Sequence, residues 1–227
     1  MNTFLPNMAI LPEAQKMLWP ALHPAALLGF VLYGGTAIAL RLGHRTSVDF
    51  DFFIEKTLDK DKIKAAFSFM PTATVLQDEL ETFTVLIKTE AADIEAYIKI
   101  SFFGLLQFGR VGEPELTKDK ILEVASLDDL MAHKLKVILQ RVEAKDYLDI
   151  AALIKAGISI EKGLSAARAF YGPAFQASES LKALTYFNGG DLETLPSETK
   201  TVLISAASKV RALPSVEIIS KKLSAHH

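Results

Sequence analysis

Short apolar runs dominate the first half of the chain, and apolar residues with helical spacing dominate the second half. Before residue 115 the runs are rich in Val, Ile, Phe and Tyr, and Gly, Pro, Asp or Ser bound them, which predicts β-strands. The predicted strands cover residues 30–35, 47–53, 72–77, 82–88 and 96–103. Periodicity over residues 36–45 and 58–70 predicts two helices among these strands.

After residue 115 the apolar residues recur every three or four positions, which predicts α-helices. The predicted helices cover residues 126–142, 145–157, 160–172, 178–190, 197–210 and 215–223. A Gly- and Pro-rich loop at residues 107–119 connects the two patterns. We therefore predict an α+β fold, with an α+β domain at residues 1–115, an all-helical domain at residues 116–227, and a ligand-binding cleft between them.

Composition narrows the function classes. The chain has 227 residues and a net charge of −2, from 25 Lys and Arg against 27 Asp and Glu, so bulk charge does not indicate nucleic-acid binding. It has no cysteine, which excludes disulfides, zinc–thiolate sites and thiol catalysis. No signal peptide begins the sequence, and the most apolar stretch, residues 21–35, is interrupted by His, Pro and Gly. We expect a cytoplasmic protein with no membrane segment.

Two aspartates interrupt the apolar strand predicted at residues 47–53. Successive side chains of a strand point to opposite faces, so Asp49 and Asp51 lie on one face, and Val48, Phe50, Phe52 and Ile54 on the other. Two neighbouring carboxylates repel each other unless a cation lies between them, and such a pair suits Mg²⁺ together with substrate phosphates. The alternative is that the aspartates form the solvated face of an edge strand.

A Gly-Gly-Thr turn precedes this acidic strand. Gly34 and Gly35 follow an apolar run and come before a predicted helix, so backbone N–H groups of the turn could approach a phosphate closely, with the Thr36 hydroxyl beside them. Arg45, at the end of that helix, could also touch phosphate. The alternatives are an ordinary strand-to-helix turn and an ordinary basic helix end.

Charged residues fall on the apolar faces of two later helices. At 100° per residue, Lys134 and Arg141 lie within the stripe formed by Leu127, Leu130, Met131 and Ile138. A cation there must reach solvent, pair with an anion or face a ligand. The open alternative is a structural salt bridge to a neighbouring helix.

The next helix repeats this feature with acidic residues. Asp146 lies on the apolar stripe formed by Ile150, Leu153 and Ile154, and Asp149 lies at the edge of the stripe. The simplest interpretation is that these acids and the two cations before them converge on the cleft and face the paired aspartates of the strand.

The order of these motifs resembles a known family. Residues 34–53, GGTAIALRLGHRTSVDFDFF, are similar to the signature of the polymerase-beta-like nucleotidyltransferase superfamily, in which such a turn precedes a strand with alternating aspartates. The sequence of this motif is most similar to the AbiEii/AbiGii toxin branch, which also has a lysine-bearing helix and a K-D-x-x-D element. Residues 133–141 and 145–150 match these two elements.

This resemblance implies a mixed sheet in the N-terminal domain and a Mg²⁺-dependent transfer of a nucleoside monophosphate from an NTP to an acceptor hydroxyl. The 3′ end of tRNA is an implied acceptor, and a cognate antitoxin is an implied partner. The implied catalytic residues are Asp49 and Asp51 on the metal, Lys134 on the triphosphate and Asp146 at the nucleophile. The expected nucleotide-binding residues are Gly34, Gly35, Thr36, Arg45, Arg141 and Asp149.

The chain departs from the superfamily pattern at Ser101. A third carboxylate is usual on the neighbouring strand, and a serine stands at the expected place, with Lys99 on the same face. One Mg²⁺ rather than two is therefore expected. Two alternatives follow: the acceptor is a small molecule or a protein side chain, or the chain is a degenerate nucleotide-binding or toxin–antitoxin interaction module.

Overall fold

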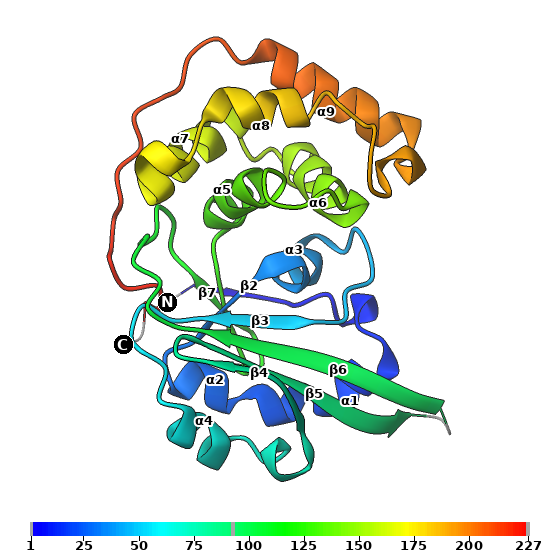
Figure 1. The fold of residues 1–227 in the computed structure, drawn as a ribbon, viewed down its shortest axis with the longest axis vertical. Coiled ribbons are helices and arrows are strands. Elements are labelled where there is room, and N and C mark those ends of the chain that lie inside the picture. The colour runs from blue at the N-terminus through cyan, green and yellow to red at the C-terminus, as the bar shows by residue number, and fades with distance from the viewer. Residues whose placement is uncertain (1, 92–93, 226–227) are drawn as a thin grey trace. The chain divides into compact units, whose positions relative to one another are not determined.

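A computed structural model describes residues 2–91 and 94–225 of the chain and contains two compact units. The sheet unit comprises Met1–Gly109, Glu113–Ala125 and Lys221–His227. The helical unit comprises Arg110–Gly112 and Ser126–Ser220. Figure 1 labels most of the helices and strands of each unit.

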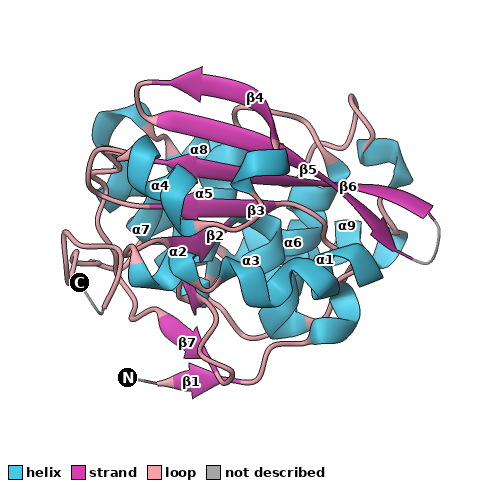
Figure 2. Cartoon of the chain, turned by 90° about the horizontal axis from the view of Figure 1, so that it is seen from below, coloured by secondary structure: helices cyan, strands magenta, loops and turns pink. Residues whose placement is uncertain are grey.

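The described residues of the sheet unit form one mixed eight-stranded sheet, with the order β1-β7-β8-β2-β3-β6-β5-β4. At its centre β2 and β3 are antiparallel, whereas β3 and β6 are parallel. Figure 2 shows the long strands β5 and β6 beside β3. The strands are β1 Thr3–Phe4, β2 Val31–Tyr33, β3 Phe50–Phe53, β4 Thr74–Glu79, β5 Thr82–Ala91, β6 Ile94–Phe103, β7 Glu115–Thr117 and β8 Glu123–Val124.

Helices cover both faces of this sheet. In Figure 1, α1, α2 and α4 lie on one side of it and α3 on the other. The side with three helices holds an aromatic core, in which Trp19 packs on Phe50 and Phe67 packs on Phe102. The helices are α1 Glu13–Leu18, α2 Pro24–Leu27, α3 Gly34–Leu42 and α4 Lys60–Ala66. These elements confirm the predicted α+β class, the five predicted strands and both helices predicted among them.

Strand β3 has the two faces that its alternation predicts. Phe50 and Phe52 are fully buried, and Ile54 just after the strand is also buried. Val48 was predicted on this buried face, but its side chain is 43 % exposed. The prediction was wrong there because pairing begins only at Phe50, so the alternation of a paired strand does not extend back to residue 48.

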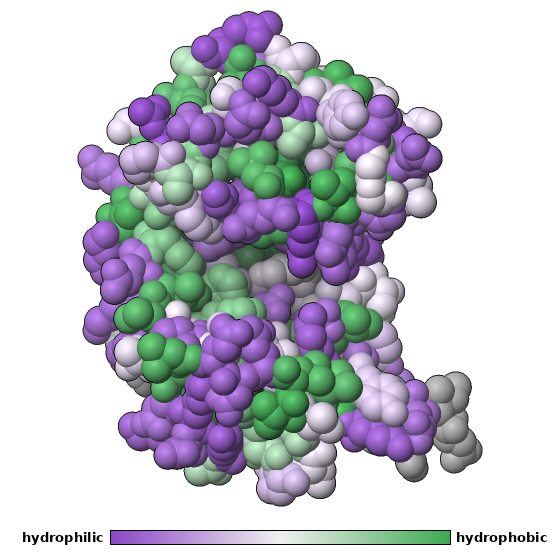
Figure 3. All heavy atoms as spheres, viewed as in Figure 1, coloured by the Kyte–Doolittle hydropathy of each residue, from purple (hydrophilic) through white to green (hydrophobic). Residues whose placement is uncertain are grey.

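The helical unit confirms five of the six predicted helices. Figure 1 shows them in green to orange. They are α5 Leu127–Val137, α6 Ala144–Lys155, α7 Ile160–Tyr171, α8 Ala177–Ala183 and α9 Ser197–Lys209. Gly163 lets α7 approach α5 closely, because a Cβ at this position would collide with Met131. On the face shown in Figure 3, hydrophilic residues cover much of this unit, with apolar residues among them.

The sixth predicted helix, at residues 215–223, does not form. Helical periodicity is present there, but tertiary partners take the backbone groups of the segment. Ile219 N–H donates to the Arg110 carbonyl and Arg110 N–H donates to the Ser220 carbonyl, both at 2.9 Å. The predicted helices at residues 126–142 and 178–190 are also too long, since α5 ends at Val137 and α8 ends at Ala183.

The connection between the two units lies further along the chain than the boundary predicted at residue 115. Strand β7 begins at that residue and β8 follows it, and they pair within the sheet with β1 and β2 respectively. Glu123 on β8 is fully buried, and its carboxylate accepts hydrogen bonds from Ser224 Oγ at 2.7 Å and from Ala225 N–H at 2.6 Å. Residues 221–225 therefore complete the sheet unit.

In the part of the chain that the structure describes, none of the helices combines the length and the hydropathy that crossing a bilayer requires.

Candidate functional site

The Gly-Gly turn lies directly against Asp51. Tyr33 at the end of β2 is opposite Asp51 on β3, so the strand pairing holds the turn beside this carboxylate. Helix α3 begins at Gly34, whose φ is +75°. A Cβ on Gly34 would lie 2.6 Å from Asp51 Oδ2. The turn and the acidic strand, which the sequence linked only by their order, are thus in contact.

Thr36 lies in the first turn of α3, and its hydroxyl is used within the protein. It is buried and donates a short hydrogen bond to the carbonyl of Asp49. Since that bond uses its one proton, the 2.7 Å contact with Ser47 requires the Ser47 hydroxyl to donate to Thr36. In the structure this hydroxyl fixes the backbone of Asp49 against α3. Its place beside a phosphate stays a prediction.

Asp49 has a cationic neighbour. Lys99 Nζ of β6 lies 3.2 Å from Asp49 Oδ2, and the two side chains are 42 % and 37 % exposed. The sequence indicated only that Lys99 shares a face with Ser101. The parallel pairing of β3 with β6 brings this lysine to the paired aspartates.

Ser101 occupies the place predicted for the missing carboxylate. It is the β6 residue opposite Asp51, and it is buried with Thr84 of β5 on its other side. Glu95 does not replace it, because it lies further along β6, opposite Glu90 rather than β3. Two aspartates are thus the acidic residues at this point of the β3–β6 pair.

The donor set fits one Mg²⁺ better than two. Across the described residues there is no group of three or more His, Asp or Glu side chains that could hold a metal. The carboxylates of Asp49 and Asp51 are both partly exposed, and the glycine turn leaves open the space next to Asp51. Mg²⁺ is usually held by one or two carboxylates, with waters and substrate phosphates as its other ligands.

Arg45 lies between α3 and β3 and is half-buried. One of its guanidinium nitrogens donates to the Thr46 carbonyl at 3.0 Å. Its role on a phosphate stays a prediction.

The four charged residues predicted on α5 and α6 form one ion-pair network. Lys134 Nζ lies 2.6 Å from Asp146 Oδ1 and 2.7 Å from Asp149 Oδ2. The lysine side chain is 5 % exposed and both aspartates are fully buried. Arg141 donates two further hydrogen bonds to the Asp146 carboxylate, at 2.8 and 3.0 Å. The helical-wheel argument therefore placed Lys134 and Asp146 correctly on buried faces.

Two positions of that argument need correction. Arg141 was placed on the apolar stripe of a longer helix, but α5 ends at Val137 and the Arg141 side chain is 46 % exposed. It reaches Asp146 from the connection between the helices. Asp149 was placed at the edge of the α6 stripe, but it is completely buried and pairs with Lys134.

The network holds Asp146 ionised. Burial alone would raise the pKa of this carboxyl, but the hydrogen bonds from Arg141 and the charge of Lys134 outweigh burial and lower the pKa below its ordinary value. A buried carboxylate with two cationic partners is stable in this form, whereas one without them is not.

The two sets of site residues belong to different units. Asp49, Asp51 and the glycine turn are in the sheet unit, and the α5–α6 network is in the helical unit. That they face each other across one cleft stays a prediction.

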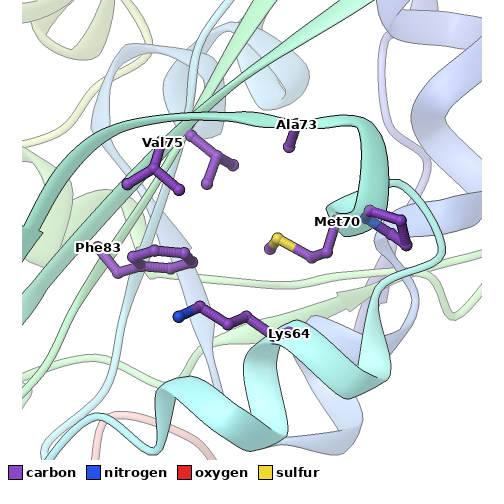
Figure 4. Close-up of a pocket in the computed structure, with 7 residues that line it drawn as sticks. Lys64, Met70, Ala73, Val75 and Phe83 are labelled. Atoms are coloured by element: carbon purple, nitrogen blue, oxygen red, sulfur yellow. The ribbon is translucent and has the colours of Figure 1, made fainter.

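A separate apolar pocket of about 250 Å³ lies in the sheet unit, beside α4 and the β4–β5 pair. Figure 4 shows Lys64 and Phe83 on one side of it, and Met70, Ala73 and Val75 around the rest. None of its lining residues is a predicted site residue.

A family model describes the same region of the chain. Residues 21–197 match the model of the nucleotidyl transferase AbiEii toxin of type IV toxin–antitoxin systems. This range contains the glycine turn, the paired aspartates and the α5–α6 network. The chain belongs to the AbiEii nucleotidyltransferase toxin family.

Similar proteins agree with this assignment at the level of the fold. JHP933 from Helicobacter pylori has a TM-score of 0.58 at 18 % identity, over 90 % of this chain and 92 % of that one. A candidate nucleotidyltransferase from H. pylori has a TM-score of 0.56 at 18 % identity, over 85 % and 91 %. The uncharacterized protein aq_aa25 of Aquifex aeolicus (strain VF5) is 32 % identical over 128 residues, so the match spans 56 % of this chain and 58 % of that relative.

Proposed function

We propose that the protein transfers a nucleoside monophosphate from an NTP to an acceptor hydroxyl and releases pyrophosphate. The observation that carries this proposal is the contact between the glycine turn and Asp51. It combines backbone N–H groups for a phosphate with carboxylates for a cation at one point of the sheet. Family membership supports the reaction class.

In this proposal Asp49 and Asp51 hold one Mg²⁺, which when bound neutralises phosphate charge and polarises the phosphorus under attack. The first N–H groups of α3, at Gly34 and Gly35, have no partner within their own helix and can donate to a phosphate oxygen. Ser47 and Thr36 keep Asp49 in place through their hydrogen bonds.

The helical unit supplies the remaining groups of the proposal. Lys134 and Arg141 are the cations proposed for the triphosphate, and Asp146 is the group proposed to position or deprotonate the acceptor hydroxyl. Asp149 holds Lys134 from the other side. The deep burial of Lys134, Asp146 and Asp149 favours a competing, structural role, and the stability of Lys134 variants separates the two roles.

The acceptor is the open part of the reaction. The resemblance favours the 3′ end of tRNA, and a small molecule or a protein side chain is the alternative. The test incubates the protein with each labelled NTP and Mg²⁺, together with total tRNA, with a small-molecule mixture or with protein alone. Label on RNA supports the first acceptor, and label only in another fraction identifies the second class.

The decisive comparison uses matched variants. Asp49→Ala should lower transfer by about 10²-fold or more, because it removes a metal ligand, whereas Asp61→Ala on the exposed surface of α4 should transfer as the wild type does. Loss of label with both variants, or with neither, would contradict the proposal.

A second candidate function rests on Ser101. With a serine opposite Asp51, the chain could bind an NTP with Mg²⁺ and release no pyrophosphate. Calorimetry that detects NTP binding while no acceptor yields pyrophosphate favours this binding module. Family membership also leads us to propose a cognate antitoxin, encoded by a neighbouring gene, whose co-expression would relieve growth inhibition by this chain.

A further inference from the structure

The position of Lys99 is fixed by the sheet. Phe50 and Ile100 are opposite each other in the parallel β3–β6 pair. Asp49 and Lys99 are the residues immediately before them in the sequence. Residues 99 and 101 are two apart on β6 and point to the same face. Lys99 therefore lies on the face of the paired aspartates, next to the place where a serine stands instead of a third carboxylate.

The ion pair between Lys99 and Asp49 contributes little to folding. Both side chains are more than a third exposed, and pairs of that kind stabilise proteins weakly. Lysine carries a compact charge on a flexible chain, so it can leave one anion for another. The sheet thus places a mobile cation at the acidic pair without needing it for stability.

The charges at this point differ from those of a three-carboxylate site. Three carboxylates carry three negative charges, which suit two divalent cations. Here two carboxylates and one ammonium leave a single negative charge, and a second divalent cation has neither ligand nor charge to hold it. Lys99 lies where its ammonium group can supply the positive charge that a second divalent cation would otherwise provide.

We propose that Lys99 replaces the second divalent cation of the site: it neutralises Asp49 before a metal binds, limits the site to one divalent ion, and then contacts a substrate phosphate. This inference rests on the proposed function. It predicts that Lys99 competes with a metal ion for Asp49, which can be measured without any turnover.

The test measures Mn²⁺ binding to the full chain without nucleotide, by calorimetry and by electron paramagnetic resonance. We expect one Mn²⁺ per wild-type chain. Lys99→Met should bind Mn²⁺ about tenfold more tightly, because a nearby positive charge is removed. Lys99→Arg, which keeps the charge, should bind Mn²⁺ as weakly as the wild type.

A matched control distinguishes this effect from the loss of any surface cation. Lys88 on β5 pairs with Glu95, and their side chains are 52 % and 56 % exposed. Lys88→Met removes the same charge from the same sheet and should leave Mn²⁺ affinity unchanged. The double variant Lys99→Met with Ser101→Asp, which rebuilds three carboxylates, should bind two Mn²⁺.

The proposal is overturned if the wild type binds two Mn²⁺, or if Lys99→Met and Lys88→Met bind Mn²⁺ equally. Thermal unfolding confirms that each variant is folded before titration. If no acceptor is labelled but the Mn²⁺ results are as expected, the proposed transfer fails while the role of Lys99 at the metal stands.

Discussion

At position 34 the chain requires a residue without a side chain for two independent reasons. The φ of +75° is a conformation that costs an L-residue about 1–2 kcal/mol. In addition, a Cβ would lie 2.6 Å from Asp51 Oδ2, so the carboxylate would have to move. The first reason concerns stability and the second concerns the site.

Gly34→Ala and Gly157→Ala separate these two reasons. Gly157 has a φ of +86° but nothing within 4 Å of an added Cβ. Each substitution should lower the free energy of unfolding by about 1 kcal/mol, measured with urea. Only Gly34→Ala should weaken Mn²⁺ binding and nucleotidyl transfer, because only it displaces Asp51. Equal Mn²⁺ affinity in the two variants would show that the close approach has no role in the site.

At the scale of single residues, the sequence predicted which face of a strand a side chain occupies better than it predicted which groups that side chain contacts. Alternation along the strand was enough to place Asp51 on the face opposite Phe50 and Phe52, whereas Asp49 lies just before the strand begins. It could not show that Thr36 uses its hydroxyl on the backbone of Asp49, since that bond joins α3 to a segment outside any regular strand.

At the scale of elements, the pair α5–α6 is held together by charges as well as by apolar contacts. Lys134 contacts two buried aspartates of α6, and Arg141 adds a bidentate contact to one of them. Removing one partner of a buried ion pair leaves an uncompensated charge, which is the costly case.

Lys134→Met should therefore lower the free energy of unfolding by about 3–5 kcal/mol, whereas Arg141→Met should cost about 1 kcal/mol because that side chain is half-exposed. Urea unfolding measures both. A Lys134→Met protein as stable as the wild type but without transfer activity would contradict the structural role and favour a catalytic one.

The start of α5 contains a second buried carboxyl, Asp129. It accepts hydrogen bonds from Val111 N–H at 2.8 Å and from the hydroxyl of Ser126 at 2.7 Å. Burial nevertheless raises its pKa to about 6, and these hydrogen bonds oppose the rise only partly. A Ser–x–x–Asp sequence is typical of a helix N-terminus, but the contact with residue 111 is long-range and is not indicated by this local pattern.

The raised pKa gives stability a pH dependence. The folded chain holds the Asp129 proton more tightly than the unfolded chain, so this group makes stability fall as the pH rises from about 4 to about 6, by roughly 2–3 kcal/mol. Asp129→Asn should remove this contribution, which urea unfolding at pH 4 and pH 6.5 measures as a difference from the wild type. An equal loss of stability between pH 4 and pH 6.5 in the wild type and in Asp129→Asn would contradict this prediction.

Elements with long periodic patterns were predictable, and elements defined by their partners were not. Helices such as α6, α7 and α9 have enough turns for apolar spacing to identify them. Strands β1, β7 and β8 are two or three residues long and exist only because a neighbouring strand pairs with them. The helix predicted at residues 215–223 is the opposite case. Its apolar spacing is helical, but its backbone forms hydrogen bonds with Arg110 instead.

At the scale of the whole molecule, neither unit is one continuous segment. Residues 110–112 belong to the helical unit, and residues 221–227 belong to the sheet unit. The change of pattern along the sequence predicts a division near residue 115, but the return of the last segment leaves no local signal. Its attachment includes donors to the buried acid Glu123, about a hundred residues away, and a hydrogen bond from Leu223 N–H to Glu55.

Deletion of residues 221–227 should destabilise the sheet unit by about 3–5 kcal/mol, because the buried carboxylate of Glu123 then loses its donors. Glu123→Gln in the shortened chain should recover part of this loss, since a neutral amide is less costly to bury unpaired than a charge. Unfolding followed by the fluorescence of Trp19, which lies in the sheet unit, measures both. No recovery would mean that other contacts of the segment hold the sheet.

The return of residues 221–225 to β8 also sets an order of events during synthesis. Domains generally fold as units while the chain emerges, but here the sheet unit receives the donors for Glu123 only after residues 126–220 have been made. A nascent chain interrupted before residue 221 would contain the glycine turn, both aspartates and every helix described above. It would still lack the segment that completes the sheet, so a prematurely ended copy of this toxin-family chain should be defective.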